Sequence, residues 1–394
     1  MDPIRNPFVP GAGTPPPALE GREEILKKAE ITLGRIQQGK PSKSFLLIGL
    51  RGVGKTVLLN RIRAIAENKG YKANLIEVHE NKSLPELLAP YLRQVLLSLD
   101  STEKMNAQIR RGLKILKSFV SAVKISINTI DIGLSIPAEK GVADSGDLEL
   151  DLPELFLAVA QAAASKNTAI AIIIDELQYL DEIELSALIM AVHRVNQQQL
   201  PLVLIGAGLP QLVGLSGKSK SYAERLFDFP EVGPLNEEDA KNALRDPVKE
   251  EGVVFEERAL DRIVNLTQGY PYFIQEWGHY AWESAAASPI TNEAVDEATR
   301  KALKNLDQSF FRVRFDRLTP RETPYLRAMA ELGATTQSSG DIAAILGVEV
   351  RSVAPIRSSL IKKGMIYSPQ HGDTAFTVPL FDQFMKRVMP KLKA

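Results

Sequence analysis

Short runs of apolar residues without polar alternation recur through the first half of the chain. They lie at 45–48, 168–174 and 201–206, and a more mixed run lies at 73–78. Such runs are typical of strands that are buried on both faces of a parallel sheet. Helix-length segments separate them, and this alternation predicts an α/β fold. We expect a parallel five-stranded sheet with helices on both faces, whose last strand follows the segment 221–227.

The pattern changes at Asn236, where helical periodicity replaces the alternation of strands and helices. Asn236 is followed by three acidic residues, a typical helix start, because the side chain caps free N–H groups and acidic residues favour the positive end of a helix. Further helices are expected at 257–267, 271–285 and 291–307. These patterns predict an α/β core over residues 21–235 and an all-helical lid over residues 236–310.

An insertion interrupts the core at residues 100–150. A basic helix is indicated by Arg110, Arg111, Lys114 and Lys117, and imperfect alternation of apolar and polar residues follows at 125–132. This pattern predicts an inserted helix and a β-ribbon. The insertion either contacts DNA or a neighbouring subunit, or simply covers the sheet.

Residues 319–394 follow another pattern. A helix ending near 332, a short helix ended by Gly347 and a third helix at 349–363 precede two strand-like runs around a polar turn at 370–373. This order resembles a winged helix-turn-helix domain, in which the third helix enters the major groove of DNA. The resemblance implies that the DNA-contacting residues are Arg351, Ser352, Arg357 and Lys362.

Composition narrows the class of protein. The length of 394 residues suggests two or three domains, and a formal net charge of zero gives no overall attraction to nucleic acid or membrane. Residues 301–394 nevertheless carry a surplus of Lys and Arg that favours DNA contact. The absence of cysteine excludes disulfides and thiolate metal sites. No apolar run approaches the ~18 residues of a membrane span, so a cytoplasmic location without membrane contact is expected.

A glycine-rich segment directly follows the apolar run 45–48 and fits GxxxxGK[ST] at every position. In such a P-loop, the glycines let backbone N–H groups converge on phosphates, the lysine adds a positive charge and the hydroxyl binds Mg²⁺. A helix beginning near Lys55 would point its positive end at the same place. The sequence therefore predicts a nucleotide site formed by Gly49, Gly52, Val53, Gly54, Lys55, Thr56 and Val57.

Two neighbouring carboxylates end the apolar run 168–174. We expect Asp175 to hold Mg²⁺ together with Thr56, because this hard cation prefers oxygen ligands. Glu176 is then placed to polarise the attacking water as a catalytic base. The alternative is that Glu176 makes only a structural contact.

The segment before the core, residues 1–20, is rich in Pro and Gly, which excludes a helix or a central strand. Two interpretations of this N-terminal arm are open. It is either a solvated leader or an extended arm laid across the base of the nucleotide.

Taken together, Gly21-Arg22, the P-loop, the strand ending in Asp175-Glu176 and the helices from Asn236 resemble the AAA+ ATPases. They are most similar to the branch that contains the origin-recognition ATPases, which implies ATP or ADP as the ligand. The resemblance also implies an arginine finger, Arg225, that reaches the γ-phosphate of a neighbouring subunit in an ATP-bound homo-oligomer. The alternative for Arg225 is an ordinary surface ion pair.

Two departures from this family concern hydrolysis. The run 205–208 lacks the Asn, Ser or Thr that the superfamily usually offers as sensor 1, and the segment 269–272 lacks a sensor 2 arginine. Gln178 and Gln211 are side chains that could compensate. The departures imply slow hydrolysis, with the nucleotide acting chiefly as a conformational switch.

Two functions remain open on the sequence. The first is an ATP-dependent switch that hydrolyses ATP slowly and whose C-terminal domain binds duplex DNA. The second is a signalling or scaffold NTPase whose C-terminal domain contacts protein instead. Salt-sensitive affinity for duplex DNA would separate them, because phosphate contacts weaken as salt is added.

Overall fold

The computed structural model describes residues 1–392 except 12, 80, 100–105, 124–136 and 371. The chain forms two compact units. One, here the core unit, comprises Glu23–Gly49 and Lys55–Glu231, and the other, here the lid unit, comprises Met1–Arg22, Leu50–Gly54 and Val232–Ala394. No helix in these described parts combines the length and the apolar character needed to cross a membrane.

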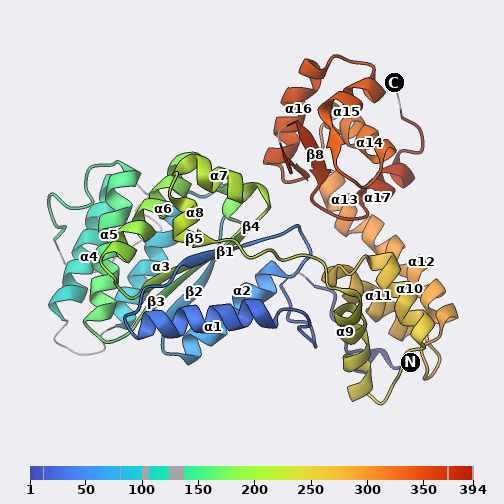
Figure 1. The fold of residues 1–394 in the computed structure, drawn as a ribbon, viewed down its shortest axis with the longest axis horizontal. Coiled ribbons are helices and arrows are strands. Elements are labelled where there is room, and N and C mark those ends of the chain that lie inside the picture. The colour runs from blue at the N-terminus through green and yellow to red at the C-terminus, as the bar shows by residue number, and fades with distance from the viewer. Residues whose placement is uncertain (12, 80, 100–105, 124–136, 371, 393–394) are drawn as a thin grey trace. The chain divides into compact units, whose positions relative to one another are not determined.

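The core unit is built on a parallel sheet of five strands in the order β2-β3-β4-β1-β5 (Figure 1). Strand β4 lies between β1 and β3, with Phe45 opposite Ile205 and Ile173 opposite Ile205 on its other side. β1, β3 and β4 are buried at every position, as their apolar runs predict. The predicted five-stranded parallel sheet is therefore confirmed. The strands are β1 (Ser44–Ile48), β2 (Lys72–Glu77), β3 (Ile170–Asp175), β4 (Leu202–Gly208) and β5 (Phe227–Asp228).

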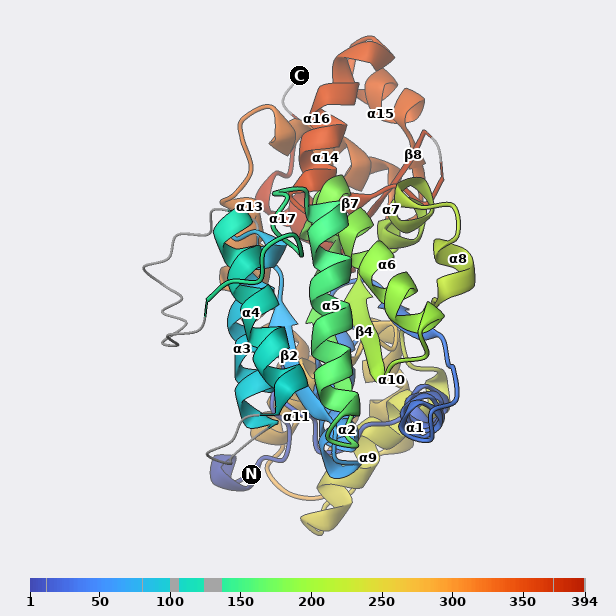
Figure 2. The ribbon, with the colours of Figure 1, turned by 90° about the vertical axis from the view of Figure 1, so that its left-hand side faces the viewer.

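Helices cover both faces of this sheet. The crossover from β1 to β2 runs through α2 (Lys55–Asn68), and α1 (Glu23–Gln37) packs beside α2. The crossovers from β2 to β3 and from β3 to β4 run the opposite way across the sheet. Because such crossovers are right-handed, their helices lie on the opposite face, as Figure 2 shows. They are α3 (Leu84–Ser98), α4 (Ala107–Ala122), α5 (Leu148–Ala164) and α6 (Glu182–Gln197).

The described part of the 100–150 insertion is a layer over the sheet. The expected basic helix is present as α4, and its apolar side packs against α3 and α5. Arg111 pairs with Glu139 at 3.0 Å on the exposed side. This packing favours the sheet-covering interpretation of the helix. The ribbon expected at 125–132 lies outside the described residues.

Helices dominate the lid unit after residue 236. Asn236 caps the first of them by accepting a hydrogen bond from the Asp239 N–H at 2.8 Å. The expected helix starts and ends agree with the structure to within one residue. The helices are α9 (Glu237–Glu250), α10 (Glu257–Thr267), α11 (Pro271–Ser284), α12 (Asn292–Gln308) and α13 (Phe310–Phe315).

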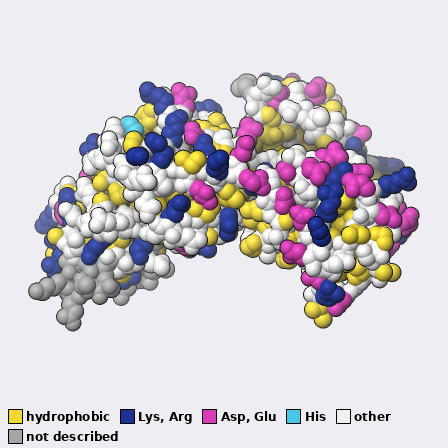
Figure 3. Space-filling model, turned by 60° about the horizontal axis from the view of Figure 1, so that its bottom comes forward, with side chains coloured by type: hydrophobic (Ala, Val, Ile, Leu, Met, Phe, Trp, Pro, Cys, Tyr) yellow, Lys and Arg dark blue, Asp and Glu magenta, His cyan; other side chains and the backbone are white. Residues whose placement is uncertain are grey.

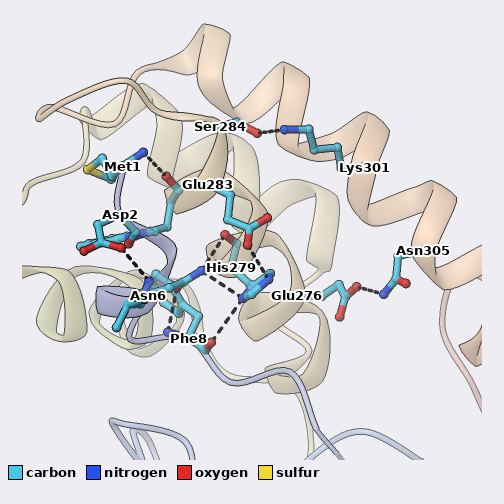
Figure 4. A network of polar contacts seen from close by, with 12 residues as sticks. Met1, Asp2, Asn6, Phe8, Glu276, His279, Glu283, Ser284, Lys301 and Asn305 are labelled. Atoms are coloured by element: carbon cyan, nitrogen blue, oxygen red, sulfur yellow. Dashed lines mark hydrogen bonds and ion pairs between the residues drawn. The ribbon is translucent and has the colours of Figure 1, made fainter.

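The first nine residues lie along α11 (Figure 4), held by hydrogen bonds and by the buried Phe8, although several of their side chains, Ile4 among them, are exposed. Trp282 donates its indole N–H to the Asp2 carbonyl at 2.8 Å, and Asn6 donates to the His279 carbonyl at 3.1 Å. Phe8 is buried against Gly278, where an added Cβ would come within 2.7 Å of the phenyl ring. Glycine at this position therefore leaves room for the arm. Residues Pro3–Arg5 form a short 3-10 helix, η1, capped by Asp2, so the expectation that this segment excludes a helix is wrong for these three residues.

The C-terminal segment contains helices and a small antiparallel sheet in the order β6-β8-β7. Helix α16 follows α15 after a turn at Gly347, which has a positive φ of 66°. The elements are α14 (Glu322–Leu332), β6 (Gln337–Ser338), α15 (Ser339–Leu346), α16 (Val350–Lys362), β7 (Ile366–Tyr367), β8 (Asp373–Phe376) and α17 (Phe381–Val388). The three predicted helices and the hairpin are present in the predicted order as α14, α15, α16 and β7–β8, whereas β6 and α17 were not predicted.

A buried carboxylate joins two of these helices. Glu322, at the start of α14, is 3% exposed and accepts hydrogen bonds from Lys363 at 2.6 Å and from the Ser359 hydroxyl at 2.7 Å. Burial alone would raise the pKa of Glu322, but these donors and the Thr319 N–H outweigh it and lower the pKa to about 2. The ionised carboxylate is therefore the form that stabilises the fold.

We predict that Glu322→Gln lowers the free energy of unfolding by about 2 kcal/mol at pH 7, because the Lys363 ammonium loses its buried charged partner. A lowered pKa means that the unfolded chain binds more protons than the folded one as pH falls. The difference between wild type and variant should thus shrink from about pH 4.5 toward pH 2. Denaturant unfolding at several pH values measures it.

Glu349→Gln is the matched control, since Glu349 and its partner Arg351 are both well exposed. It should change the free energy of unfolding by less than about 1 kcal/mol. An equal effect of the two substitutions, or a Glu322→Gln effect independent of pH, would contradict the assigned role of Glu322.

Candidate functional site

The glycine-rich loop joins β1 to α2 and owes its shape to two backbone angles. Gly52 and Gly54 have φ values of 84° and 91°, a region that side chains with a Cβ rarely adopt. Gly49 donates its N–H to the Gly208 carbonyl at 3.1 Å, which holds the start of the loop to the end of β4. Helix α2 begins at Lys55, so its unpaired N–H groups follow directly on the loop.

Lys55 is buried, with 6% of its surface exposed. Its ammonium donates to the Gly49 carbonyl at 2.9 Å, so the side chain turns back toward the end of β1. A buried ammonium is a strong local source of positive charge, because little water screens it. Val57 follows in the first turn of α2 and is half-buried.

Thr56 and Asp175 meet although 119 residues separate them in the sequence. The Thr56 hydroxyl donates to Asp175 Oδ2 at 2.6 Å, and Asp175 is 2% exposed at the end of β3. Burial raises the pKa of the Asp175 carboxyl, and the Thr56 hydrogen bond offsets this only in part. A hydroxyl and a carboxylate are oxygen ligands of the kind that Mg²⁺ prefers, with water and phosphate completing its shell.

These two side chains fit a Mg²⁺ ion that is held partly by its nucleotide. Among the described residues, no three His, Cys, Asp or Glu side chains gather in a metal-binding arrangement. A metal cage made by protein alone is therefore not part of the described structure. The predicted ligands Thr56 and Asp175 are brought together as the sequence indicated, and their role as ligands stays a prediction.

Glu176 has an unusual backbone conformation. Its φ of 58° and ψ of 36° lie in the left-handed region, and it directly precedes the short helix η3 (Leu177–Tyr179). A residue other than glycine in that region costs on the order of 1 kcal/mol, and such strain is often found at functional sites. Gln178 donates its side-chain amide to Glu176 Oε2. The carboxylate is thus held by a neighbour rather than left to rotate in solvent.

Arg22 is a residue whose contribution the sequence did not reveal. It is buried in the lid unit and donates to the Val53 carbonyl at 3.2 Å and to the Gly233 carbonyl at 2.5 Å. Within the same unit, the Tyr272 N–H donates to the Gly52 carbonyl at 3.2 Å. These three bonds are accepted by backbone carbonyls, two of them in the loop, whereas the Arg51 N–H of the loop donates to the Thr377 carbonyl at 3.2 Å. The pair Gly21-Arg22 was a sequence signal, but nothing in it indicated this target.

Arg225 lies near the amino end of β5, whereas the glycine-rich loop follows the carboxyl end of β1. It is exposed in the short helix α8 (Ala223–Leu226), directly before β5, and Phe227 of β5 pairs with Ser44 at the start of β1. The loop follows the end of β1, about 13 Å further along at the usual rise per residue. Arg225 is therefore poorly placed to act on a nucleotide bound by its own loop.

The four predicted DNA-contacting residues differ in their surroundings. Arg351, Ser352 and Lys362 are exposed on α16. Arg357 is half-buried and donates to Thr374 Oγ1 at 3.0 Å, to Ser368 Oγ at 2.6 Å and to the Asp373 carbonyl at 2.7 Å. Arg357 therefore holds the hairpin of β7 and β8 against α16. Its contact with DNA stays a prediction.

Comparison with known proteins finds a family model that matches this part of the chain. Residues 18–205, which contain the loop, β1 to β3 and the first residues of β4, match the model described as AAA ATPase domain. Over these residues the chain is similar to an AAA ATPase domain. Nucleotide binding is thus supported for this domain, and Mg²⁺ typically accompanies it. Residues 308–385 match a second family, described as a domain of unknown function.

Whole-chain comparisons extend beyond the ATPase domain. The chain is 23% identical over 368 residues to an uncharacterized HTH-type transcriptional regulator of Methanocaldococcus jannaschii, covering 90% of this chain and 85% of that protein. A Walker-type ATPase of Pyrococcus abyssi has a similar fold, with a TM-score of 0.60, 19% identity and coverage of 93% and 96% of the two chains.

A further solved structure, the Orc1 protein of Aeropyrum pernix in complex with DNA, has a TM-score of 0.48 and 17% identity over 98% of this chain and 96% of that one. Together with the family match, the Pyrococcus abyssi structure confirms that the fold is that of a P-loop ATPase.

We predict opposite effects of Asp175→Asn on stability and on metal-dependent binding. Because burial raises the pKa of Asp175, the ionised form opposes folding at pH 7, and a neutral amide should maintain or raise the melting temperature. The same change should abolish the strengthening of ATP binding by Mg²⁺. Calorimetric titration of ATP with Mg²⁺ and with EDTA measures this.

Glu182→Gln, an exposed carboxylate in the first turn of α6, is the control and should leave the Mg²⁺ effect intact. A Mg²⁺ effect in Asp175→Asn equal to that of wild type would remove Asp175 from the metal site.

Proposed function

We propose that this protein is an ATP-dependent switch that hydrolyses ATP slowly and binds duplex DNA through its C-terminal segment. The observation that carries the proposal is the cluster at one edge of the sheet: the buried Lys55 ammonium, the Thr56–Asp175 pair and Glu176 beside it. In the proposal, Lys55 and the loop N–H groups bind the phosphates, and Thr56 and Asp175 hold Mg²⁺. Glu176 orients the attacking water.

Arg225 acts on the nucleotide of a neighbouring subunit in this proposal. Arg225 is exposed and lies near the amino end of β5, away from the carboxyl end of β1 where the loop begins. Both features support action between subunits rather than within one. A guanidinium is always charged and stabilises negative charge that develops on a transferring phosphoryl group. The ATP-bound form would therefore be a homo-oligomer.

The C-terminal segment supports the DNA part of the proposal. We propose that it is a winged helix whose recognition helix is α16. Its helix–strand–helix–helix–hairpin order and the exposed side chains of Arg351, Ser352 and Lys362 support this assignment. The name of the Methanocaldococcus jannaschii relative, an HTH-type regulator, is consistent with it.

Negative charge on residues 236–261 restricts where DNA could bind. Residues 236–261, which contain α9, contain nine Asp or Glu and only four Lys or Arg. Figure 3 shows acidic side chains crowded over one part of the surface. An acidic surface repels phosphates, so the surface formed by residues 236–261 is a poor DNA contact. The basic C-terminal segment is the better one.

We predict measurable affinity for duplex DNA in low salt, stronger with ATP than with ADP, that falls as salt is added. Arg351→Ala and Lys362→Ala should each weaken binding and lower the slope of log K against log salt by about one. Arg300→Ala, an exposed arginine on α12, is the control and should do neither. Fluorescence anisotropy with a labelled duplex measures these affinities.

Failure to bind duplex DNA in low salt with either nucleotide would reject the DNA part of the proposal. The alternative, a signalling or scaffold NTPase, is favoured by one observation: Arg357 is already bonded within its own domain. A nucleotide-dependent change in mass by light scattering without any DNA binding would support that alternative.

A further inference from the structure

The last residues of β4 leave a gap that another element fills. Gly206 and Gly208 do not have positive φ values, so their backbone does not require glycine. A Cβ on Gly206 would lie 2.3 Å from Leu177 Cδ1, and one on Gly208 would lie 2.9 Å from Gln178 Oε1. The small residues of β4 therefore make room for η3 and for the side chain of Gln178.

Gln178 uses both ends of its amide in this space. Its Oε1 accepts the Leu209 N–H at 3.0 Å, directly after β4. Because a backbone N–H can only donate, this bond fixes which end of the amide is the oxygen. The nitrogen Nε2 must then face the Glu176 carboxylate, to which it donates. The amide connects Glu176 to the end of β4.

We propose that Gln178 is the positioning residue for Glu176 and takes the place of the polar side chain that β4 lacks. This inference rests on the proposed function, in which Glu176 orients the attacking water. Without the Gln178 amide, the Glu176 carboxylate could still polarise water, but it would no longer be held in one orientation. Misplacement of a catalytic group by about 1 Å costs on the order of 10²-fold in rate.

The test uses two substitutions at Gln178 in the full-length protein. Gln178→Ala removes both hydrogen bonds. Gln178→Glu keeps the length of the side chain and an acceptor for the Leu209 N–H, but removes the donor to Glu176. If the amide positions Glu176, both variants should lower kcat for ATP hydrolysis by about 10- to 100-fold, with KM and the calorimetric Kd for ATP unchanged within about twofold.

A second glutamine supplies the control. Gln211 begins α7 (Gln211–Ser219), and its side-chain oxygen has no hydrogen-bond partner among the described residues. Gln211→Ala should leave kcat unchanged. In a double-mutant cycle, Gln178→Ala should cause no further loss in a Glu176→Gln background, because the group that it positions has already been altered.

Selective ¹⁵N-glutamine labelling gives a readout that is independent of turnover. The Gln178 side-chain amide signal, identified by its loss in Gln178→Ala, should shift in Glu176→Ala, while the Gln211 signal should not. An unmoved Gln178 signal, a wild-type kcat in Gln178→Glu, or additive losses in the cycle would overturn the inference.

Failure of the proposed function would look different. Absence of turnover in the wild type, or undiminished turnover in Glu176→Gln, contradicts the assigned hydrolysis. In that case, the NMR shift still decides whether Gln178 holds Glu176, and its absence overturns the inference independently.

Discussion

The parallel pairing of β4 with both β1 and β3 is the constraint on which the site depends. It brings the carboxyl ends of β1 and β3 to one edge of the sheet, with a single strand between them. Thr56 and Asp175 meet across that strand. Side chains larger than glycine at Gly206 and Gly208 would instead collide with Leu177 of η3 and with Gln178, the residue that bonds Glu176. The small residues at the end of β4 therefore make room for the segment that follows Asp175.

Several residues at the same edge of the sheet lower the stability of the fold. Buried Lys55 and Asp175 bear a desolvation cost, and Glu176 has a strained backbone. A site made only for stability would avoid all three. All three features are expected of a site that binds a charged ligand. Charged groups that are shielded from water interact more strongly with the charges of a bound ligand.

Much of this could be predicted from the sequence because the decisive signals are local. Apolar runs indicate buried strands, the glycine-rich loop follows the first run, and the Asp175-Glu176 pair ends the third. Asn236 and Gly347 likewise mark a helix start and a helix end within their own neighbourhoods. The carboxyl ends of parallel strands share an edge, so Thr56 and Asp175 were expected at the same edge of the sheet, although the strand order that brings them together was not predicted.

Local sequence patterns could not predict several contacts between segments that are distant in the sequence. The packing of the N-terminal arm on α11 depends on Gly278, which has no special signature in the sequence. Arg357 has the residue type and helical position of a DNA contact, yet its partners come from the hairpin that follows. Gln178 was only one of two candidate glutamines until its bond to the Leu209 N–H distinguished them.

The most direct test of the account is calorimetric titration of ATP and Mg²⁺ into Lys55→Ala, compared with wild type and with Lys27→Ala, an exposed lysine on α1. Loss of a buried charged donor to phosphate should weaken the Kd by about 10- to 100-fold, since such a bond contributes about 1.5–3 kcal/mol. Lys27→Ala should bind as wild type does. Undiminished ATP binding by a folded Lys55→Ala protein would contradict the account.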